Sequence, residues 1–157
     1  MNALETQFAV ERLNARYVAA IDEGRLEDWP NFFTQRCRYQ ITTRENYAKG
    51  LPIGIFVADS RGMLQDRVAS LREANIYEVQ SYRHLVTSTL VTGEIAGVVA
   101  AQSNFQVVRI TEAGVMTLFA TGRYLDRINL NGPEPLFLEK IAVCDSRRID
   151  TLLALPL

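Results

Sequence analysis

The sequence is poor in the side chains that hold redox metals. Its 157 residues include one histidine, His84, and two cysteines, Cys37 and Cys144, which lie far apart and form no CxxC pair. A mononuclear iron site of the facial-triad type needs two histidines and a carboxylate, and a Rieske cluster needs two histidines and two cysteines. Structural zinc needs four nitrogen or sulfur ligands. We therefore predict that this chain binds no metal and no redox cofactor of its own.

The sequence also has no excess of charge of one sign and no long apolar run. With 18 acidic and 17 basic side chains, the net charge is −1, so we expect no attraction to nucleic acid or to an anionic membrane surface. No apolar run is long enough to cross a bilayer, and the first residues lack the pattern of a secretory signal. We predict a cytoplasmic protein whose cysteines are reduced.

The first part of the sequence has the pattern of three helices. Asn2 followed by Glu5 resembles a capping box, and Gly24 is a natural helix end. The apolar stripe expected on this first helix consists of Leu4, Phe8, Leu13, Tyr17 and Ile21. A second, short helix is expected to contain Leu26, Trp29, Phe32 and Phe33, with Pro30 in its first turn. Ser60 is the predicted cap of a third helix that turns Leu64, Val68 and Leu71 inward.

Much of the remaining sequence has the residue pattern of β-strands separated by turns. A half-buried strand is expected at 37–43, and a loop follows it. Four longer runs rich in Val, Thr, Phe and Ile cover 82–92, 97–110, 115–128 and 135–146, with turns predicted at Thr92-Gly93, Ala113-Gly114 and Asn131-Gly132-Pro133. Long strands with tight connections form a curved, mainly antiparallel sheet, whose concave face the helices must cover. We predict one α+β domain, 1–157, shaped as a cone with a cavity at its mouth.

Such a cone has room for a small acid–base site around His84. A histidine beside a carboxylate in an apolar cavity can remove a proton next to a carbonyl or assist a dehydration. The candidate partners are Asp22, Asp59 and Tyr39. The other interpretation is a hydrogen-bonded core histidine, which is the more common role of a lone histidine among apolar neighbours. The later strands favour that interpretation, because their few charges are expected near the strand ends.

The last residues, 150–157 (DTLLALPL), contain four leucines and almost no charge. Chain ends are usually polar and frayed unless other contacts hold them. An apolar end left in water would be an adhesive patch. The segment is therefore expected either to close the core of its own chain or to dock against another chain.

Ordered blocks of residues run through nearly the whole chain: 26–34 (LEDWPNFFT), 37–39 (CRY), 44–46 (REN), 63–68 (MLQDRV), 71–78 (LREANIYE), 82–84 (YRH), 139–146 (EKIAVCDS) and 150–157. Together they resemble the small (beta) subunits of aromatic-ring-hydroxylating dioxygenases, in particular the branch of terephthalate dioxygenase, salicylate 5-hydroxylase and the anthranilate-type enzymes. The resemblance implies a cone of the nuclear-transport-factor-2-like (NTF2-like) type, shared with ketosteroid isomerase and scytalone dehydratase.

The resemblance also implies a terminal oxygenase of three large and three small subunits that acts on an aromatic acid. The large (alpha) subunit would hold the Rieske 2Fe-2S cluster and the mononuclear iron, and a separate reductase would supply electrons from NAD(P)H. This chain would be a structural subunit within a trimeric base, with no catalytic residue. As contacts to neighbouring subunits we name Arg67, Arg72, Tyr82, Arg83, Leu155 and Leu157. The alternative is a stand-alone isomerase or dehydratase with His84 as general base and Asp59 and Tyr39 as further candidates.

Overall fold

The fold was analysed in a computed structural model, which describes residues 1–51, 54–74, 79–146 and 155–157. Helices dominate the first half of the chain and long strands the second, which confirms the predicted α+β class. The elements are α1 (Ala3–Asp22), the 3-10 helix η1 (Leu26–Phe32), β1 (Phe33–Thr43), α2 (Arg44–Ala48), β2 (Phe56–Ser60), α3 (Arg61–Ala74), β3 (Gln80–Ile95), β4 (Val98–Thr111), β5 (Met116–Asn129) and β6 (Leu136–Cys144).

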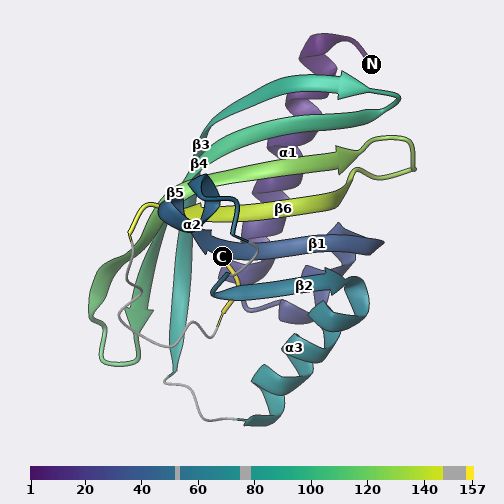
Figure 1. The fold of residues 1–157 in the computed structure, drawn as a ribbon. Coiled ribbons are helices and arrows are strands. Elements are labelled where there is room, and N and C mark those ends of the chain that lie inside the picture. Colours follow the sequence, from purple (N-terminus) through teal and green to yellow (C-terminus); the bar gives the residue numbers. More distant parts are fainter. Residues whose placement is uncertain (52–53, 75–78, 147–154) are drawn as a thin grey trace.

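The strands form one six-stranded sheet in the order β2-β1-β6-β5-β4-β3. All neighbours are antiparallel except β1 and β6, which are parallel. Strands β3, β4 and β5 bend sharply, while α1 crosses behind the sheet and α3 lies beyond β2 (Figure 1). The pairing is irregular after Thr87 in β3 and after Val107 in β4, and Ser88 has a left-handed backbone (φ 53°). Irregularities of this kind bend a strand and increase its twist.

Helix α1 begins and ends where the sequence predicts. The Asn2 side chain accepts a hydrogen bond from the Glu5 N–H, the Glu5 carboxylate accepts one from the Asn2 N–H, and Gly24 has φ +75° just after the helix. The predicted apolar stripe is correct only in its second half. Leu4 and Phe8 are exposed, and the first turns instead bury Thr6 and Val10.

The second helix is a 3-10 helix, with Pro30 inside it instead of in its first turn, and Phe33 already belongs to β1. Helix α3 matches its prediction. Ser60 Oγ accepts a hydrogen bond from the Met63 N–H at 3.2 Å. The three predicted inward residues, Leu64, Val68 and Leu71, are buried.

The long strands match the four predicted runs, but two further elements and one turn were missed. The short β2 and α2 fall in a stretch that the sequence assigns to a loop. Gly93 lies inside β3, and the hairpin turns at Ala96 and Gly97, which both have positive φ values of 50° and 76°. Left-handed backbone at both central residues fits a two-residue hairpin turn.

Helix α1 also covers the edge of the sheet at β3. The Gln7 side-chain amide donates to the main-chain oxygen of Thr89 at 2.8 Å. The Asp22 carboxylate accepts from the main-chain N–H of His84 at 2.9 Å. Side chains of α1 thus bond main-chain groups that an edge strand would otherwise present to other strands.

Candidate functional site

A buried histidine–carboxylate pair joins α1 to β3. His84 Nδ1 lies 2.6 Å from Asp22 Oδ1, and the exposed fractions of the two side chains are 0% and 4%. Because the other Asp22 oxygen accepts from the His84 main-chain N–H, both ends of the carboxylate are fixed. In the part of the chain that the structure describes, His84 Nε2 is buried without a hydrogen-bond partner. This pair has the geometry of an oriented base.

The two other candidates for this site lie elsewhere. Asp59 is exposed and forms an ion pair with Arg38 at 3.1 Å. Tyr39 is buried, and its hydroxyl donates to the main-chain oxygen of Leu157 at 2.9 Å. The carboxylate beside His84 is therefore Asp22, one of the three partners predicted from the sequence, and not Asp59.

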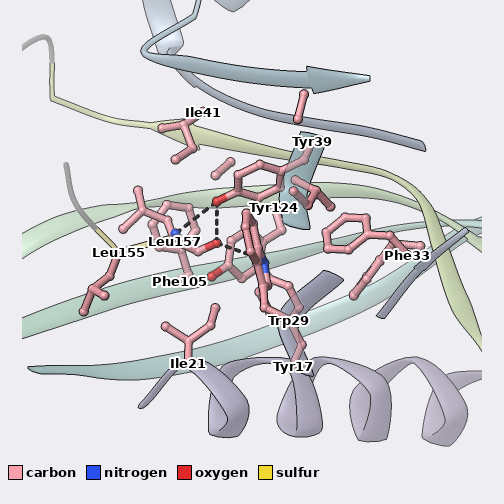
Figure 2. Close-up of a cluster of buried hydrophobic side chains, with 14 of the residues drawn as sticks. Tyr17, Ile21, Trp29, Phe33, Tyr39, Ile41, Phe105, Tyr124, Leu155 and Leu157 are labelled. Atoms are coloured by element: carbon pink, nitrogen blue, oxygen red, sulfur yellow. Dashed lines mark hydrogen bonds between the residues drawn. The ribbon is translucent and has the colours of Figure 1, made fainter. Parts of the chain in front are cut away.

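The end of the chain lies inside the cone (Figure 2). Leu155 and Leu157 are buried, and the main-chain oxygen of Leu157 accepts hydrogen bonds from Tyr17 and Tyr39 at 2.8 and 2.9 Å. Trp29 Nε1 donates to the Tyr17 hydroxyl at 3.1 Å. Of the two outcomes left open by the sequence, residues 155–157 thus close the core of their own chain. Residues 150–154 lie outside the described residues.

A buried ion pair lies between β5 and β6. Lys140 Nζ is 3.2 Å from both carboxylate oxygens of Asp126, and both side chains have an exposed fraction of 0%. Nζ also donates to Asn14 Oδ1 at 3.2 Å and lies 3.7 Å from the centroid of the Tyr124 ring. Burial lowers the pKa of Lys140 and raises that of Asp126, and each partner opposes the shift of the other.

Sequence reasoning missed this pair, because it expected the charges of the late strands near their ends. A signal was available. Asp126 has the same parity in β5 as the buried Tyr124 and Ile128, and Lys140 is its direct partner in β6. Two opposite charges at paired inward positions indicate a buried ion pair.

The hydroxyl and thiol groups of the interior are held in their neutral forms. Burial raises the pKa of Tyr17, Tyr39, Tyr82 and Tyr124. It also raises the pKa of the Cys144 thiol to about 12. These groups can donate or accept hydrogen bonds, but they are not ionised nucleophiles or bases near neutral pH.

The six interface candidates separate into three groups. Tyr82, Leu155 and Leu157 are buried within this chain, which removes them from the surface that a neighbouring subunit could contact. Arg72 forms two hydrogen bonds to the Glu27 carboxylate and one to the Gly24 oxygen, and Arg67 lies 5.4 Å from the centroid of the Phe56 ring. Arg83 is exposed on β3.

The Arg72–Glu27 pair predicts a small dependence of stability on acid. Hydrogen bonds from Arg72 are the main reason that the pKa of Glu27 falls from 4.5 to about 2. The folded state therefore binds this proton less tightly than the unfolded state, so the contribution is present above about pH 4.5 and is lost as the pH falls toward 2. Since both side chains are largely exposed, we expect it to be below about 1 kcal/mol.

The measurement is the free energy of unfolding of the wild type and of Glu27→Gln between pH 2 and pH 6. The two curves should differ above pH 4.5 and converge toward pH 2. Glu73→Gln, at an exposed position of α3, controls for the loss of one negative charge. A difference that stays constant over this range would contradict the assignment.

The donor set does not fit a redox metal. In the described ranges, no three His, Cys, Asp or Glu side chains are grouped so that they could hold a metal ion. Both cysteines are buried in separate strands, β1 and β6, and the lone histidine is already bonded to Asp22.

None of the helices in the described residues is long and apolar enough to cross a membrane.

The fold and the filled interior define a class of protein: an NTF2-like cone whose cavity is closed by its own chain. Comparison with known proteins then gives the family, since residues 16–151 match the family described as the ring-hydroxylating beta subunit. The chain is 42% identical over 151 residues to the beta 1 subunit of the terminal oxygenase component of terephthalate 1,2-dioxygenase from Comamonas sp., covering 96% of this chain and 98% of the relative. It is 37% identical to the small subunit of anthranilate 1,2-dioxygenase from Burkholderia cepacia, covering 98% and 96%.

Solved structures agree with this match. A beta subunit assigned to an aromatic-ring-hydroxylating dioxygenase of Novosphingobium aromaticivorans has a TM-score of 0.91 and 37% identity, and the match covers 99% of each chain. A protein from the same organism assigned as a scytalone dehydratase, only 12% identical, shares the fold with a TM-score of 0.73, covering 97% of this chain and 92% of that one. The chain belongs to the family of ring-hydroxylating beta subunits, and the resemblance noted in the sequence is confirmed.

Proposed function

We propose that this chain is the small, non-catalytic subunit in the terminal oxygenase component of a multicomponent ring-hydroxylating oxygenase that acts on an aromatic acid. The observation that carries the proposal is the filled cone, in which Leu157 occupies the space between Tyr17 and Tyr39. The relatives named for terephthalate and anthranilate dioxygenases support the choice of an aromatic acid. A stand-alone isomerase or dehydratase built on His84 is not favoured, because the relatives are oxygenase subunits.

The redox chemistry is assigned to other chains. Rieske and mononuclear iron centres need two histidines each, whereas this chain has one histidine, buried and bonded to Asp22. We therefore place the Rieske 2Fe-2S cluster and the mononuclear iron on the large alpha subunit, with electrons from NAD(P)H through a separate reductase. The oxygenase as a whole would be an oxidoreductase of the cytoplasm.

We further propose that residues 1–157 form one domain that assembles as a trimer within a complex of three large and three small subunits. A single sheet supports one domain, because β1 from the first half of the chain pairs with β6 from the second half, so both halves contribute strands to the same sheet.

A candidate surface for this assembly lies on the outer face of the bent sheet. Across β3, β4 and β5, Arg83 pairs with Val108, and Val108 pairs with Leu118, so the three side chains share one face. Leu118 has an exposed fraction of 62%. Met116, two residues away in β5, pairs with Ile110 of β4 and has an exposed fraction of 72%. Apolar side chains beside an exposed arginine are typical of the centre of a subunit interface.

A charge introduced on this face should weaken assembly. Buried at an interface, Leu118→Asp would leave an unpaired carboxylate in an apolar contact, so we expect the complex to dissociate at least about tenfold more readily. Arg83→Ala should act in the same direction. The measurement is the mass of the co-purified complex against protein concentration. Leu4→Asp, at another exposed leucine, in α1, is the matched control; disassembly by that variant alone would place the interface on α1.

The function is tested by purifying the tagged chain from its native host and identifying its partners by mass spectrometry. We expect a larger chain in near-stoichiometric amount, with Rieske-type ligands in its sequence and with bound iron. Recovery of the small chain alone, colourless and self-associated, would overturn the proposal.

A further inference from the structure

The outer face of the bent sheet contains a polar groove of about 790 Å³. Two rows of directly paired residues from β3, β4 and β5 line it: Thr87, Asn104 and Arg123, and Leu85, Gln106 and Thr121. Because Leu85 lies two residues after Arg83 in β3, the groove continues the face that carries Arg83, Val108 and Leu118. A partner that covers those three side chains therefore meets the groove as well.

One positive charge in this groove has no counter-charge from its own chain. Arg44 and Asp145, which also line the groove, form an ion pair, whereas the exposed Arg123 forms none among the described residues. Asn104 and Gln106, both exposed on β4, add side-chain amides that can donate hydrogen bonds. A guanidinium beside amide donors fits a carboxylate. The groove is therefore suited to an acidic side chain.

The tip of the β3–β4 hairpin carries the complementary groups. Glu94 is exposed and forms no ion pair within the described ranges, and Ile95 has an exposed fraction of 82%. The turn that follows them is held from another loop, because the Asn131 side-chain amide donates to the Ala96 oxygen at 3.0 Å. Since neighbouring residues of a strand point to opposite faces, this fixed tip presents a carboxylate on one side and an apolar side chain on the other. A tip that is ordered before binding loses less entropy when it binds.

The two sides of the groove match the two sides of this tip. Arg123 on β5 and Leu85 on β3 lie on either side of β4, and Leu85 is half-exposed, at 48%. An inserted tip can therefore place Glu94 against Arg123 and Ile95 against Leu85. The tip lies at the end of the sheet away from the bend (Figure 1). Along β3 it is about 30 Å from Leu85, at roughly 3.3 Å per residue, so it cannot reach the groove of its own chain.

We infer that the β3–β4 hairpin tip of one copy of this chain enters the outer groove of the next copy, where Glu94 pairs with Arg123. Because the two surfaces differ, the contact is head-to-tail, and such contacts form a ring where the rotation between copies closes. A free anion is a poorer occupant, since it would leave the apolar Leu118 on the same face in water. The inference rests on the proposed trimer and names the contact that joins its copies.

A charge-reversal cycle in the co-purified complex tests this pair. Arg123→Glu and Glu94→Arg each place like charges in the contact, so the protein concentration at which half of the complex dissociates should rise at least about tenfold. The double variant has opposite charges again, in reversed order, and should return this concentration to within about threefold of the wild type. Arg36→Glu, at an exposed arginine of β1, is the matched control and should have no effect. Unchanged assembly in both single variants, or no recovery in the double variant, overturns the inference.

A covalent trap separates failure of this contact from failure of the proposed function. Under mild oxidation, a chain with both Glu94→Cys and Arg123→Cys should form disulfides between copies and give covalent trimers, whereas each single variant should give none. The native cysteines, Cys37 and Cys144, are buried. Recovery of the large chain with no cross-linked small chains would leave the proposed function intact, overturn this contact and assign the groove to the large subunit. Small chains that cross-link into trimers without a large partner would support the contact and count against the proposed function.

Discussion

Replacing Lys140 with Ala should destabilise the protein by about 3–5 kcal/mol, because it leaves the Asp126 carboxylate buried without its cation. In the wild type, Lys140 is completely buried and is bonded to Asp126 and Asn14. Burial already raises the pKa of Asp126, and Lys140 is the main group that opposes this shift. The measurement is the free energy of urea unfolding at neutral pH, followed by the fluorescence of Trp29.

The double variant Lys140→Met/Asp126→Val separates the ion pair from the packing. With both charges removed and apolar volume retained, most of the lost stability should return. Recovery should be incomplete, because Asn14 Oδ1 loses its donor. Lys49→Ala is the control for removing a lysine, since Lys49 makes an exposed pair with Glu45 and should have little effect. Equal stability of Lys140→Ala and the wild type would contradict the assigned pair.

The second large effect is expected from Gly122→Ala in β5. A Cβ atom at this position would lie 2.0 Å from the main-chain oxygen of Val143 and 2.9 Å from its carbonyl carbon. These atoms belong to the neighbouring strand β6 and cannot move as a flexible side chain does. The two strands would have to separate where Gly122 pairs with Cys144. We expect a loss of more than about 4 kcal/mol, or no folded protein.

Gly62→Ala is the matched control for this substitution. Near the start of α3, the nearest atom to an added Cβ is Ser60 Oγ at 3.7 Å, an ordinary contact. Alanine there should stabilise the helix by about 0.5–1 kcal/mol. The comparison of folded yield and urea midpoint for the two variants is the measurement. A folded Gly122→Ala protein with wild-type stability would show that β5 and β6 are less closely apposed.

Local signals in the sequence predict the secondary structure well. The capping pair Asn2 and Glu5, the helix cap Ser60 and the long strands each act through neighbours in the chain, and all occur in the structure. Pairing between strands that are distant in the chain is harder to predict from the sequence than these local features. The short β2 is stabilised by β1, and β1 lies parallel to β6 about a hundred residues later, so no local pattern could reveal either contact.

The candidate site was predicted only in part, for a similar reason. The sequence places His84 near the start of a predicted strand, but the carboxylate beside it depends on how α1 lies along β3. Asp22 is the last residue of α1 and reaches His84, whereas Asp59 is at the outer edge with Arg38. The spacing of apolar residues placed Leu4 and Phe8 on the buried stripe of the first helix, but both are exposed, because an apolar stripe does not reveal how far along a helix the sheet extends.

The position of Leu157 also determines when this chain can complete its fold on the ribosome. Its oxygen bonds Tyr17, which is 140 residues earlier in the sequence. During synthesis, the interior between α1 and the sheet therefore stays unfilled until residues 155–157 have left the ribosome. The exposed aromatic walls would make that interval the one in which the nascent chain most needs a chaperone or its partner subunit.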